Sequence, residues 1–492
     1  MPEGRHSRRD FLRGAAAAGA MFVLPGSLVG CGTGSARRAG ASPLGTVEDR
    51  RGWDLVPEIL SRIRPPVFPN RDFPVTAYGA VGDGATDGSE AFREAIAACH
   101  RAGGGRVVVP AGRFLTGPVH LRSNVELHLS EGATLLFSTD PEDYLPAVFT
   151  RYEGIEIMGY SPLIYVFEQE NVAITGTGTL DGQASNEHWW PRTGRPERGW
   201  REGMPIDRPE INRMGELAEA GVPVEQRVFG EGSNLRPQFI QPYRCRNVLI
   251  EGVTIHNSPM WQVNPVLCEN VTVRGLRIIS HGPNNDGCNP ESCRDVLIED
   301  CYFDTGDDCI AIKSGRNADG RRVNTPSENV VIRRCRMKDG HGGVVFGSEI
   351  SGGVRNVFAE ECVMDSPRLQ RAIRFKTNSV RGGFFDNIYV RNITVGEVRE
   401  AVLLIDFHYQ EGDSGPFKPE VRNVELRNVT SQKSRYALLL RGFHHTPIAG
   451  VRLIDCRFEN VQEGNRIEHV EGLELHNVVI NGRQVRELAS TL

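Results

Sequence analysis

Residues 329–337 read NVVIRRCRM, an asparagine followed by apolar residues that alternate with polar ones. The pattern also occurs as NVLIEGVTI at 247–255, NVTVRGLRI at 270–278 and DVLIEDCYF at 295–303. Further copies begin at 171, 356, 387, 423, 450 and 472. A period of two is typical of a β-strand. Units about 22–25 residues apart cannot bury their own apolar faces and have to stack. The sequence therefore predicts an all-β protein, a parallel β-helix.

Seven of the eleven cysteines fall at two fixed positions of this repeat. They are Cys301, Cys335, Cys362 and Cys456, six residues after the start of a copy, and Cys245, Cys268 and Cys293, two residues before it. Equivalent positions on neighbouring strands have parallel Cα–Cβ bonds about 4.8 Å apart. A disulfide needs a Cβ–Cβ separation of about 3.5–4.5 Å, so these thiols are expected to be buried and unpaired. The sequence leaves open whether two of Cys99, Cys288 and Cys309 form a disulfide.

The composition of the 492 residues is that of a globular protein, with 39% hydrophobic and 24% charged residues and a net charge of -5. This balance argues against binding of nucleic acid or of a membrane surface through bulk charge. No phosphate loop, nucleotide fingerprint or metal-ligand spacing occurs, so no cofactor and no metal are expected. A monomer is favoured, although the sequence does not determine the oligomeric state.

The first thirty residues have the features of an export signal. Residues 7–14, SRRDFLRG, resemble a twin-arginine motif, and a short apolar stretch follows. The stretch ends at Cys31 in a sequence that resembles a bacterial lipobox, which predicts a lipid-anchored protein at the cell envelope. The alternative is a chance arginine pair before an ordinary signal and an unrelated cysteine. The predicted organisation is a signal peptide at 1–30, a tether at 31–70 and a β-helix catalytic domain at 71–492.

Two segments of the predicted domain depart from the repeat. Residues 89–105, SEAFREAIAACHRAGGG, predict a helix that covers the open end of the solenoid. An insertion at about 185–236, rich in Trp, Arg, Pro and Gly, is expected to project from one face. It either limits one end of a binding groove or packs on the solenoid.

Charged residues recur beside one strand of successive units. The segment DCIAIKSG at 308–315 aligns with GGVVFGSE at 342–349 and AIRFKTN at 372–378. This alignment points Arg374 and Lys376 outward and places Asp286 next to Asp308. His341 lies twelve residues after the start of its copy, as Asp307 does. Both residues of the Asp307–Asp308 pair reach one groove only if the chain bends at Gly306.

The predicted groove thus holds three carboxylates, an imidazole and two cations. Charges that only keep a solenoid soluble would be scattered along its axis. Close carboxylates cannot all ionise, so one keeps a proton and is able to act as an acid. Glycoside hydrolysis needs one carboxylic acid and one carboxylate, and the cations would bind the carboxylate of an acidic sugar.

Four short motifs in this order resemble those of glycoside hydrolase family 28, the polygalacturonase family. They are Asn284-Asn285-Asp286, Gly306-Asp307-Asp308, Gly340-His341-Gly342 and Arg374-Phe375-Lys376. The resemblance covers roughly residues 72–480 and implies a right-handed parallel β-helix. It implies inverting hydrolysis of α-1,4-linked galacturonic acid, in which Asp307 is the general acid, His341 tunes it, and Asp286 and Asp308 hold the attacking water.

The resemblance also assigns Arg374, Lys376, Asn284 and, without a sharp motif, Tyr409 to substrate binding. An inverting pair is expected about 6.5–9.5 Å apart. Asn289 stands where many relatives have an acidic residue, which leaves the subsite preference open. The substrate would be an acidic plant polysaccharide, a galacturonan. An insertion that limits one end of the groove would favour attack from a chain end.

Three alternatives remain. A related hydrolase would act on rhamnogalacturonan or another decorated galacturonan. A pectate-lyase-like enzyme would use the aspartates as calcium ligands, but the His341 and Arg374–Lys376 motifs favour hydrolysis. A β-solenoid that binds glycans without cleaving them would show no turnover, and this would separate it from the enzymes.

Overall fold

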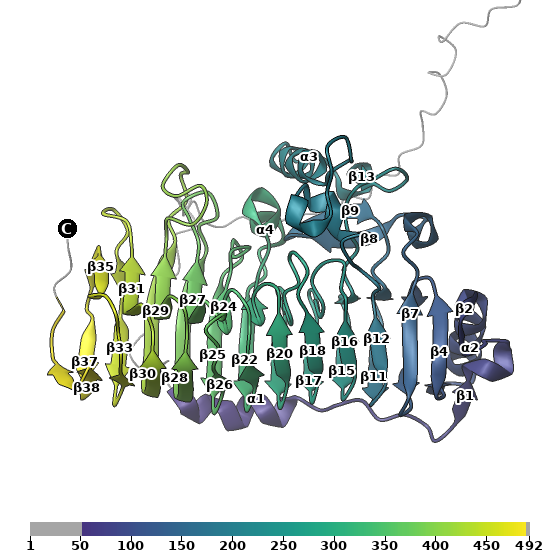
Figure 1. Ribbon diagram of the computed structural model, residues 1–492, viewed down its shortest axis with the longest axis horizontal. Coiled ribbons are helices and arrows are strands. Elements are labelled where there is room, and N and C mark those ends of the chain that lie inside the picture. Colours follow the sequence, from purple (N-terminus) through teal and green to yellow (C-terminus); the bar gives the residue numbers. More distant parts are fainter. Residues whose placement is uncertain (1–51, 489–492) are drawn as a thin grey trace, which may run out of the picture. The chain divides into compact units, whose positions relative to one another are not determined.

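The computed structural model describes residues 52–488, which form one compact unit. Short strands stack coil upon coil into a parallel β-helix, whose axis lies horizontally in Figure 1. The fold class predicted from the repeat is confirmed. Each coil contributes strands to three sheets that enclose the core.

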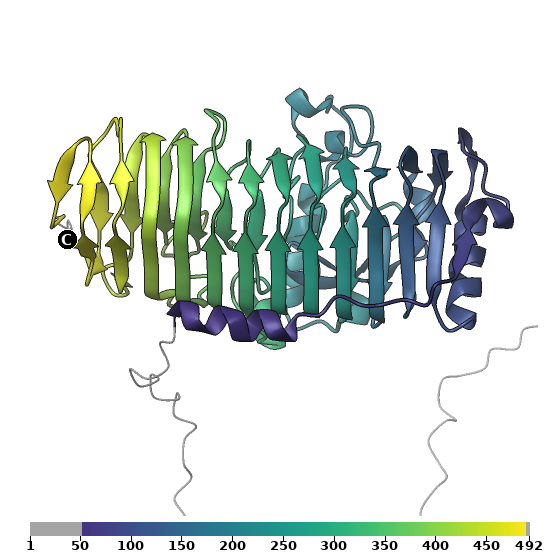
Figure 2. The same cartoon turned by 90° about the horizontal axis from the view of Figure 1, so that it is seen from below.

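The first sheet contains the strand that opens each copy of the repeat, and Figure 2 shows its parallel strands side by side. Its strands are β3 (Gly105–Val109), β6 (Val125–Leu129), β11 (Glu170–Gly176), β15 (Arg246–Glu251), β17 (Glu269–Arg274), β19 (Arg294–Glu299), β22 (Ser327–Arg333), β25 (Val354–Glu360), β28 (Phe384–Glu397), β30 (Glu420–Lys433), β33 (Val451–Ile454) and β37 (Glu474–His476). The copies pair in register, with Val271 between Val248 and Val296.

The second sheet follows after a bend in each coil. It comprises β4 (Gly112–Thr116), β7 (Ala133–Phe137), β12 (Thr179–Asp181), β16 (Thr254–His256), β18 (Arg277–Ser280), β20 (Tyr302–Thr305), β23 (Arg336–Met337), β26 (Val363–Met364), the later halves of β28 and β30, β34 (Arg457–Phe458) and β38 (Val478–Ile480). β39 (Arg483–Val485) adds to it in antiparallel orientation.

The third sheet carries the residues singled out from the sequence. It comprises β5 (Val119–His120), β10 (Ile164–Phe167), β14 (Ile240–Tyr243), β21 (Ile310–Ile312), β24 (Val344–Phe346), β27 (Arg371–Lys376), β29 (Ala401–Asp406), β31 (Tyr436–Arg441) and β35 (Arg466–Glu468). Single bridges through Val263 and Cys288 connect β14 with β21. A small pair, β32 (Ile448–Ala449) and β36 (Val470–Glu471), lies between the last coils.

A ladder of asparagine side chains explains why most copies of the repeat begin with Asn. These residues have left-handed backbones, with φ of 57° at Asn270 and 54° at Asn356, which Asn adopts more readily than most residues. The Nδ2 of Asn270 donates to Oδ1 of Asn247 at 2.7 Å, and Asn387 likewise donates to Asn356 at 3.1 Å. The ladder thus satisfies polar groups where each coil turns sharply.

The core is a single column of apolar side chains from every coil. The cysteines of both predicted positions lie in it, and the ten cysteines at described positions are all buried and free, including Cys99, Cys288 and Cys309. The backbone N–H of Cys245 points to Sγ of Cys268 at 3.4 Å, as expected of stacked neighbours. They therefore behave as small apolar residues.

The predicted capping helix is α2 (Ser89–Arg101), whose Phe92, Ala95 and Ile96 pack against the first coil. It is flanked by β1 (Asp72–Pro74), η3 (Val75–Tyr78) and β2 (Asp83–Asp87). The tether predicted at 31–70 is wrong over its C-terminal part, because η2 (Gly52–Leu55) and α1 (Val56–Arg62) pack along the first sheet (Figure 2). Ile59 and Ile63 contact Val331 and Phe358 there.

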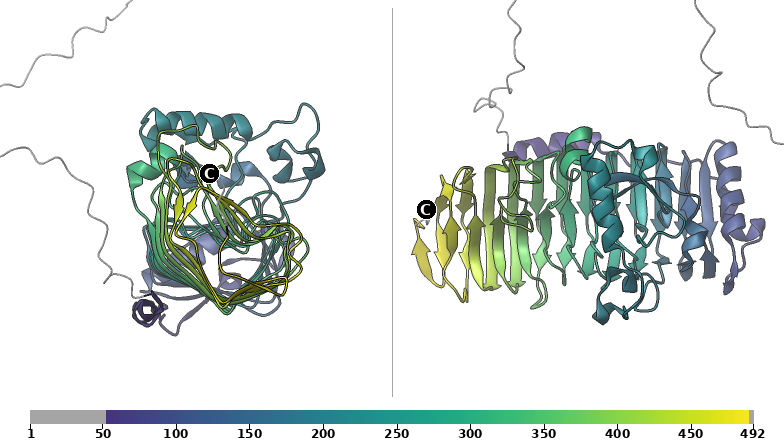
Figure 3. Two further views of the ribbon diagram at one scale, coloured as in Figure 1. Left: turned by 90° about the vertical axis from the view of Figure 1, so that its left-hand side faces the viewer. Right: turned by 90° about the horizontal axis from the view of Figure 1, so that it is seen from above.

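The insertion forms a separate lobe on one face of the solenoid (Figure 1, and both panels of Figure 3). It contains η5 (Trp190–Thr193), η6 (Pro196–Arg198), α3 (Arg208–Glu219), η7 (Val224–Gln226) and β13 (Val228–Phe229). An earlier segment outside the repeat joins this lobe. It contains η4 (Pro141–Tyr144) and a hairpin of β8 (Val148–Tyr152) and β9 (Ile155–Gly159), and β9 pairs with β13.

This lobe is fixed to the solenoid by its own apolar cluster and by buried ion pairs. Met214 and Phe229 pack with Trp261 of the solenoid. Arg227 Nη1 lies 2.7 Å from Asp319 Oδ1 in α4 (Asn317–Val323), with both side chains buried. Among the described residues, no helix is both long and apolar enough to cross a membrane.

Candidate active site

The third sheet brings the predicted residues of four coils together. Ile310 of β21 pairs with Val344 of β24, which pairs with Ile373 of β27, and Cys288 is bridged to Ile310. The residues just before these positions therefore stack as well. Asp286, Asp307, Asp308 and His341 lie at this turn, and Arg374 and Lys376 follow on the outward side of β27.

The adjacent aspartates both reach the site because the chain bends before β21 begins. Residues 306 and 307 form this bend, as the sequence predicted. A Cβ atom at Gly306 would lie 2.3 Å from the carbonyl oxygen of Gly282 on the preceding coil. Only glycine allows this close approach, so Gly306 fixes the direction of both carboxylates.

Asp307 is the most exposed of the three carboxylates, with 19% of its side chain accessible against 5% for Asp286 and none for Asp308. His341 Nδ1 donates to Asp307 Oδ1 at 2.9 Å, and the backbone N–H of Asp308 donates to the same oxygen. Burial alone would raise the pKa of Asp307, but the hydrogen bond and charge of His341 hold it well below its usual range. The same hydrogen bond raises the pKa of His341.

Asp308 is fully buried and paired with both predicted cations. Its Oδ2 lies 2.6 Å from Lys376 Nζ, and its Oδ1 lies 3.2 Å from Arg374 Nη1. Burial opposes ionisation, yet Lys376 and Arg374 lower the pKa of Asp308. Arg374 and Lys376 point outward as predicted, but they are 8% and 6% exposed because Asp308 holds them against the floor of the site.

Asp286 has the weakest compensation for its charge. Its Oδ2 accepts a hydrogen bond from Asn289 Nδ2 at 2.9 Å, and Lys313 Nζ lies 3.6 Å away. Burial, together with the neighbouring Asp307 carboxylate, raises the pKa of Asp286 to about 8, although Lys313 opposes the rise. At neutral pH the proton retained among the three carboxylates therefore lies on Asp286.

Lys313 and its partner Glu349 are part of the site and were missed in the sequence. Lys313 Nζ lies 2.9 Å from Glu349 Oε2 and 4.3 Å from the ring centroid of Trp261. Burial would lower the pKa of Lys313, but Glu349 and Asp286 raise it. Ile310 and Ile312 align with the inward-pointing Ile373 and Phe375 of β27. The same alternation therefore predicts that Lys313, which follows Ile312, points outward.

The remaining predicted residues surround this centre. The ring of Tyr409 lies 5.6 Å from the Arg374 guanidinium and 5.5 Å from Lys376 Nζ, which places it beside the cations. Asn284 lies at the edge of the site, where its Oδ1 accepts from Arg236 Nη2 at 2.8 Å. Asn285 is buried and binds backbone groups of its own turn and of the preceding coil, so its role is structural. Cys31 lies outside the described residues.

The carboxylates are closer together than the sequence predicted. One oxygen of each of Asp286, Asp307 and Asp308 lies within 4.8 Å of the others, compared with the expected separation of about 6.5–9.5 Å. The cations Lys313, Arg374 and Lys376 permit this proximity by offsetting the repulsion. A water molecule with two hydrogen bonds of about 2.8 Å spans up to about 5.6 Å, so one water fits between two of these oxygens.

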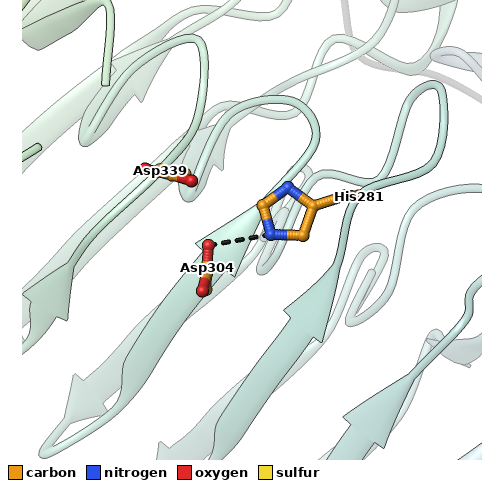
Figure 4. Close-up of side chains that lie close together, drawn as sticks. All are labelled: His281, Asp304 and Asp339. Atoms are coloured by element: carbon orange, nitrogen blue, oxygen red, sulfur yellow. Dashed lines mark ion pairs between the residues drawn. The ribbon is translucent and has the colours of Figure 1, made fainter. Parts of the chain in front are cut away.

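A second cluster of titratable groups lies beside the first. His281, Asp304 and Asp339 offer ligand atoms within 4.8 Å of one another (Figure 4). His281 Nε2 pairs with Asp304 at 2.8 Å, Lys338 lies 3.2 Å from the same carboxylate, and Arg368 pairs with Asp339 at 2.5 Å. Since both carboxylates already have cationic partners, this cluster is an ion-pair network.

A β-helix that gathers three aspartates, a histidine and three cations in one site has the site of a carbohydrate-cleaving enzyme, a glycoside hydrolase. The model of "Glycosyl hydrolases family 28" matches residues 227–477, and the chain belongs to this family. The resemblance seen in the four motifs is thereby confirmed.

Similar proteins are known from sequence and structure. A "Probable polygalacturonase" of Vitis vinifera is 33% identical over 68% of this chain, and the "Exo-poly-alpha-D-galacturonosidase" of Dickeya chrysanthemi is 28% identical over 69%. These matches span 63% and 57% of the relatives' own lengths. An exopolygalacturonase of Thermotoga maritima superposes with a TM-score of 0.86 and 48% identity, covering 88% of this chain and 97% of that one.

The N-terminal motif is also matched. The model of the twin-arginine translocation signal covers residues 5–25, which supports export of the protein across a membrane. This agrees with the export signal predicted from residues 7–14.

Proposed function

We propose that the protein hydrolyses α-1,4-linked galacturonic acid in pectin-type polysaccharides from a chain end. The observation that carries this proposal is the set of three carboxylates within 4.8 Å beside two buried cations. The carboxylates supply acid and base, and Arg374 and Lys376 provide donors for a substrate carboxylate. The names of the Dickeya and Thermotoga relatives support attack from a chain end.

In the proposed mechanism Asp307 and His341 act together as the acid. The pair shares one proton along the 2.9 Å hydrogen bond, and Asp307 is the carboxylate most accessible to a glycosidic oxygen. The proton passes to that oxygen as the bond to the sugar carbon breaks. The hydrogen bond to Asp307 raises the pKa of His341, which favours retention of this proton on the pair.

The attacking water lies between Asp286 and Asp308. Asp308 is kept ionised by Lys376 and Arg374, so it accepts a proton from the water. Asp286, which holds a proton, orients the same water through a hydrogen bond. Water attacks the face opposite the departing oxygen, so the configuration at the sugar carbon inverts.

Digestion of polygalacturonate in the presence of a chelator tests the activity. The expected result is new reducing ends without ultraviolet-absorbing unsaturated product, and release of short uronides from the first time point. Proton NMR of early products is expected to show the β-anomer. Unsaturated product that appears only with calcium would show that the enzyme acts by elimination and not by hydrolysis. Fragments of random length would show endo attack and not exo attack.

We further propose that Cys31 is lipidated and that the anchor holds the exported enzyme at the cell envelope. The support is the order of the signal match at 5–25 and the Leu28-Val29-Gly30-Cys31 sequence. Labelling with a radioactive fatty acid is expected to mark the protein and to miss the Cys31→Ser variant. Equal labelling of both would exclude this anchor.

A further inference from the structure

A cavity of about 380 Å³ opens directly beside the catalytic turn. Its lining includes Gly306, Gly340 and His341, so it shares a wall with the residues that position Asp307. The lining also includes Arg198, which comes from η6 of the insertion. The insertion therefore contributes a side chain to the surroundings of the reacting centre.

Four of the residues around this cavity are basic, and three of them have their charge balanced. His341 pairs with Asp307 at 2.9 Å. Arg368 pairs with Asp339 at 2.5 Å. His281 pairs with Asp304 at 2.8 Å (Figure 4). Arg198 has no carboxylate within ion-pair distance among residues 52–488. Its Nε is buried there without a hydrogen-bond partner. A positive charge without a counter-ion on a cavity wall is suited to an anionic ligand.

The Arg198 guanidinium is held in place before any ligand binds. Its Nη1 donates to the backbone carbonyl of His281 at 2.8 Å, and its Cζ lies 5.9 Å from the ring centroid of Trp190. Trp190 is itself fixed, because its Nε1 donates to the carbonyl of Ser258 at 2.9 Å. An arginine fixed in this way loses little conformational entropy on binding.

We propose that Arg198 binds the carboxylate of a second uronic acid residue, next to the one at Arg374 and Lys376. The inference rests on the proposed function, because a polyuronide carries one carboxylate on each sugar ring. A neutral sugar in this cavity would leave the charge of Arg198 without a partner. The insertion therefore selects an acidic neighbour and does more than limit the length of the groove.

The test compares Arg198→Met with Arg198→Lys and with Arg195→Met, an exposed arginine of the same segment. Substrates are short oligogalacturonides with free or methyl-esterified carboxylates. In the wild type, esterification of the second residue is expected to raise KM at least tenfold. Arg198→Met is expected to remove this discrimination by raising KM for the free acid, with kcat within twofold. Arg198→Lys should retain part of it, and Arg195→Met all of it.

Binding separates failure of this subsite from failure of the proposed function. Calorimetry with the Asp307→Asn variant, with and without Arg198→Met, measures affinity for galacturonate oligomers and for another acidic oligosaccharide such as an oligomannuronate. Affinity that depends on Arg198 and falls with added salt supports the subsite, even if galacturonan is not cleaved. Equal affinity with and without Arg198, or unchanged discrimination in Arg198→Met, would overturn it.

Discussion

The ammonium group of Lys313 lies 3.6 Å from Asp286 Oδ2 and 2.9 Å from Glu349 Oε2, so one buried lysine joins two buried carboxylates. The side chain of Lys313 is 2% exposed. A charge in such surroundings is stable only while its partners remain. This lysine therefore links the electrostatics of the active site to the stability of the coils that carry it.

Replacement of Lys313 by Met is expected to lower both stability and activity. Glu349 would lose its closest cation, which typically costs about 3 kcal/mol in a buried pair. The double variant Lys313→Met/Glu349→Gln is expected to regain stability but not activity, because Asp286, which orients the water, loses the ammonium group 3.6 Å from its Oδ2 that holds it in position. Denaturant unfolding and kcat measure the two effects. Lys433→Met, which breaks an exposed pair with Glu397, serves as control. Full activity of the double variant would contradict a role at Asp286.

Replacement of Asp286 by Asn is expected to stabilise the protein at high pH. The folded pKa of about 8 lies above the unfolded value of 3.8, so the folded state retains a proton that the unfolded state releases. Stability due to Asp286 is therefore lost as the pH rises from about 4 to 8. Asn has no such loss, and we expect a gain on the order of 3 kcal/mol at pH 8 and little gain near pH 4. Thermal unfolding of both proteins across this range is the measurement. A pH-independent difference would contradict the raised pKa.

Replacement of Asp307 by Asn is expected to lower kcat by about 10³-fold with little effect on binding, because it removes the acid. Asp300→Asn, which alters an exposed ion pair with Arg334, is the matched control. Binding to Asp307→Asn is read by calorimetry, and a loss of affinity that explains the loss of rate would point to a structural defect.

The proton shared by His341 and Asp307 is expected to set the alkaline limit of activity. Since Asp307 raises the pKa of His341, the imidazole keeps its proton above pH 6.5 and activity falls when the pH exceeds the raised value. The same ion pair stabilises the fold below pH 6.5, and this contribution is lost as the pH rises through the raised pKa. In His341→Gln the alkaline limb of the kcat profile is expected to move. An unchanged limb would assign it to another group.

Replacement of Asn356 by Ala tests the asparagine ladder. The variant loses hydrogen bonds to Asn329 and Asn387 and places alanine at a φ of 54°. We expect a loss of about 2 kcal/mol. Asn356→Gly is expected to lose about 1 kcal/mol less, because glycine accepts this backbone conformation. Equal losses in denaturant unfolding would mean that the backbone conformation contributes nothing, and Asn186→Ala on the exposed insertion is the control.

The sequence by itself determined the β-helix and most of the site. A strand period of two, repeated at intervals near one coil, leaves stacking as the only way to bury the apolar positions. Stacking in register then brings equal positions of successive units together. For this reason Asp286, Asp308 and Arg374 were predictable as neighbours although up to 88 residues separate them.

Only the tertiary structure decided the contacts that follow no period. The packing of α1 on the first sheet, the union of β8–β9 with the insertion, and the position of Arg198 beside His341 all join segments outside the repeat. The tertiary structure also decided which charged side chains form ion pairs with one another. That Lys313 binds Glu349, and that Asp308 draws Arg374 and Lys376 into the floor, depends on distances across coils. Periodicity specifies which face a side chain takes, whereas ion pairing depends on the few ångströms that separate its neighbours on that face.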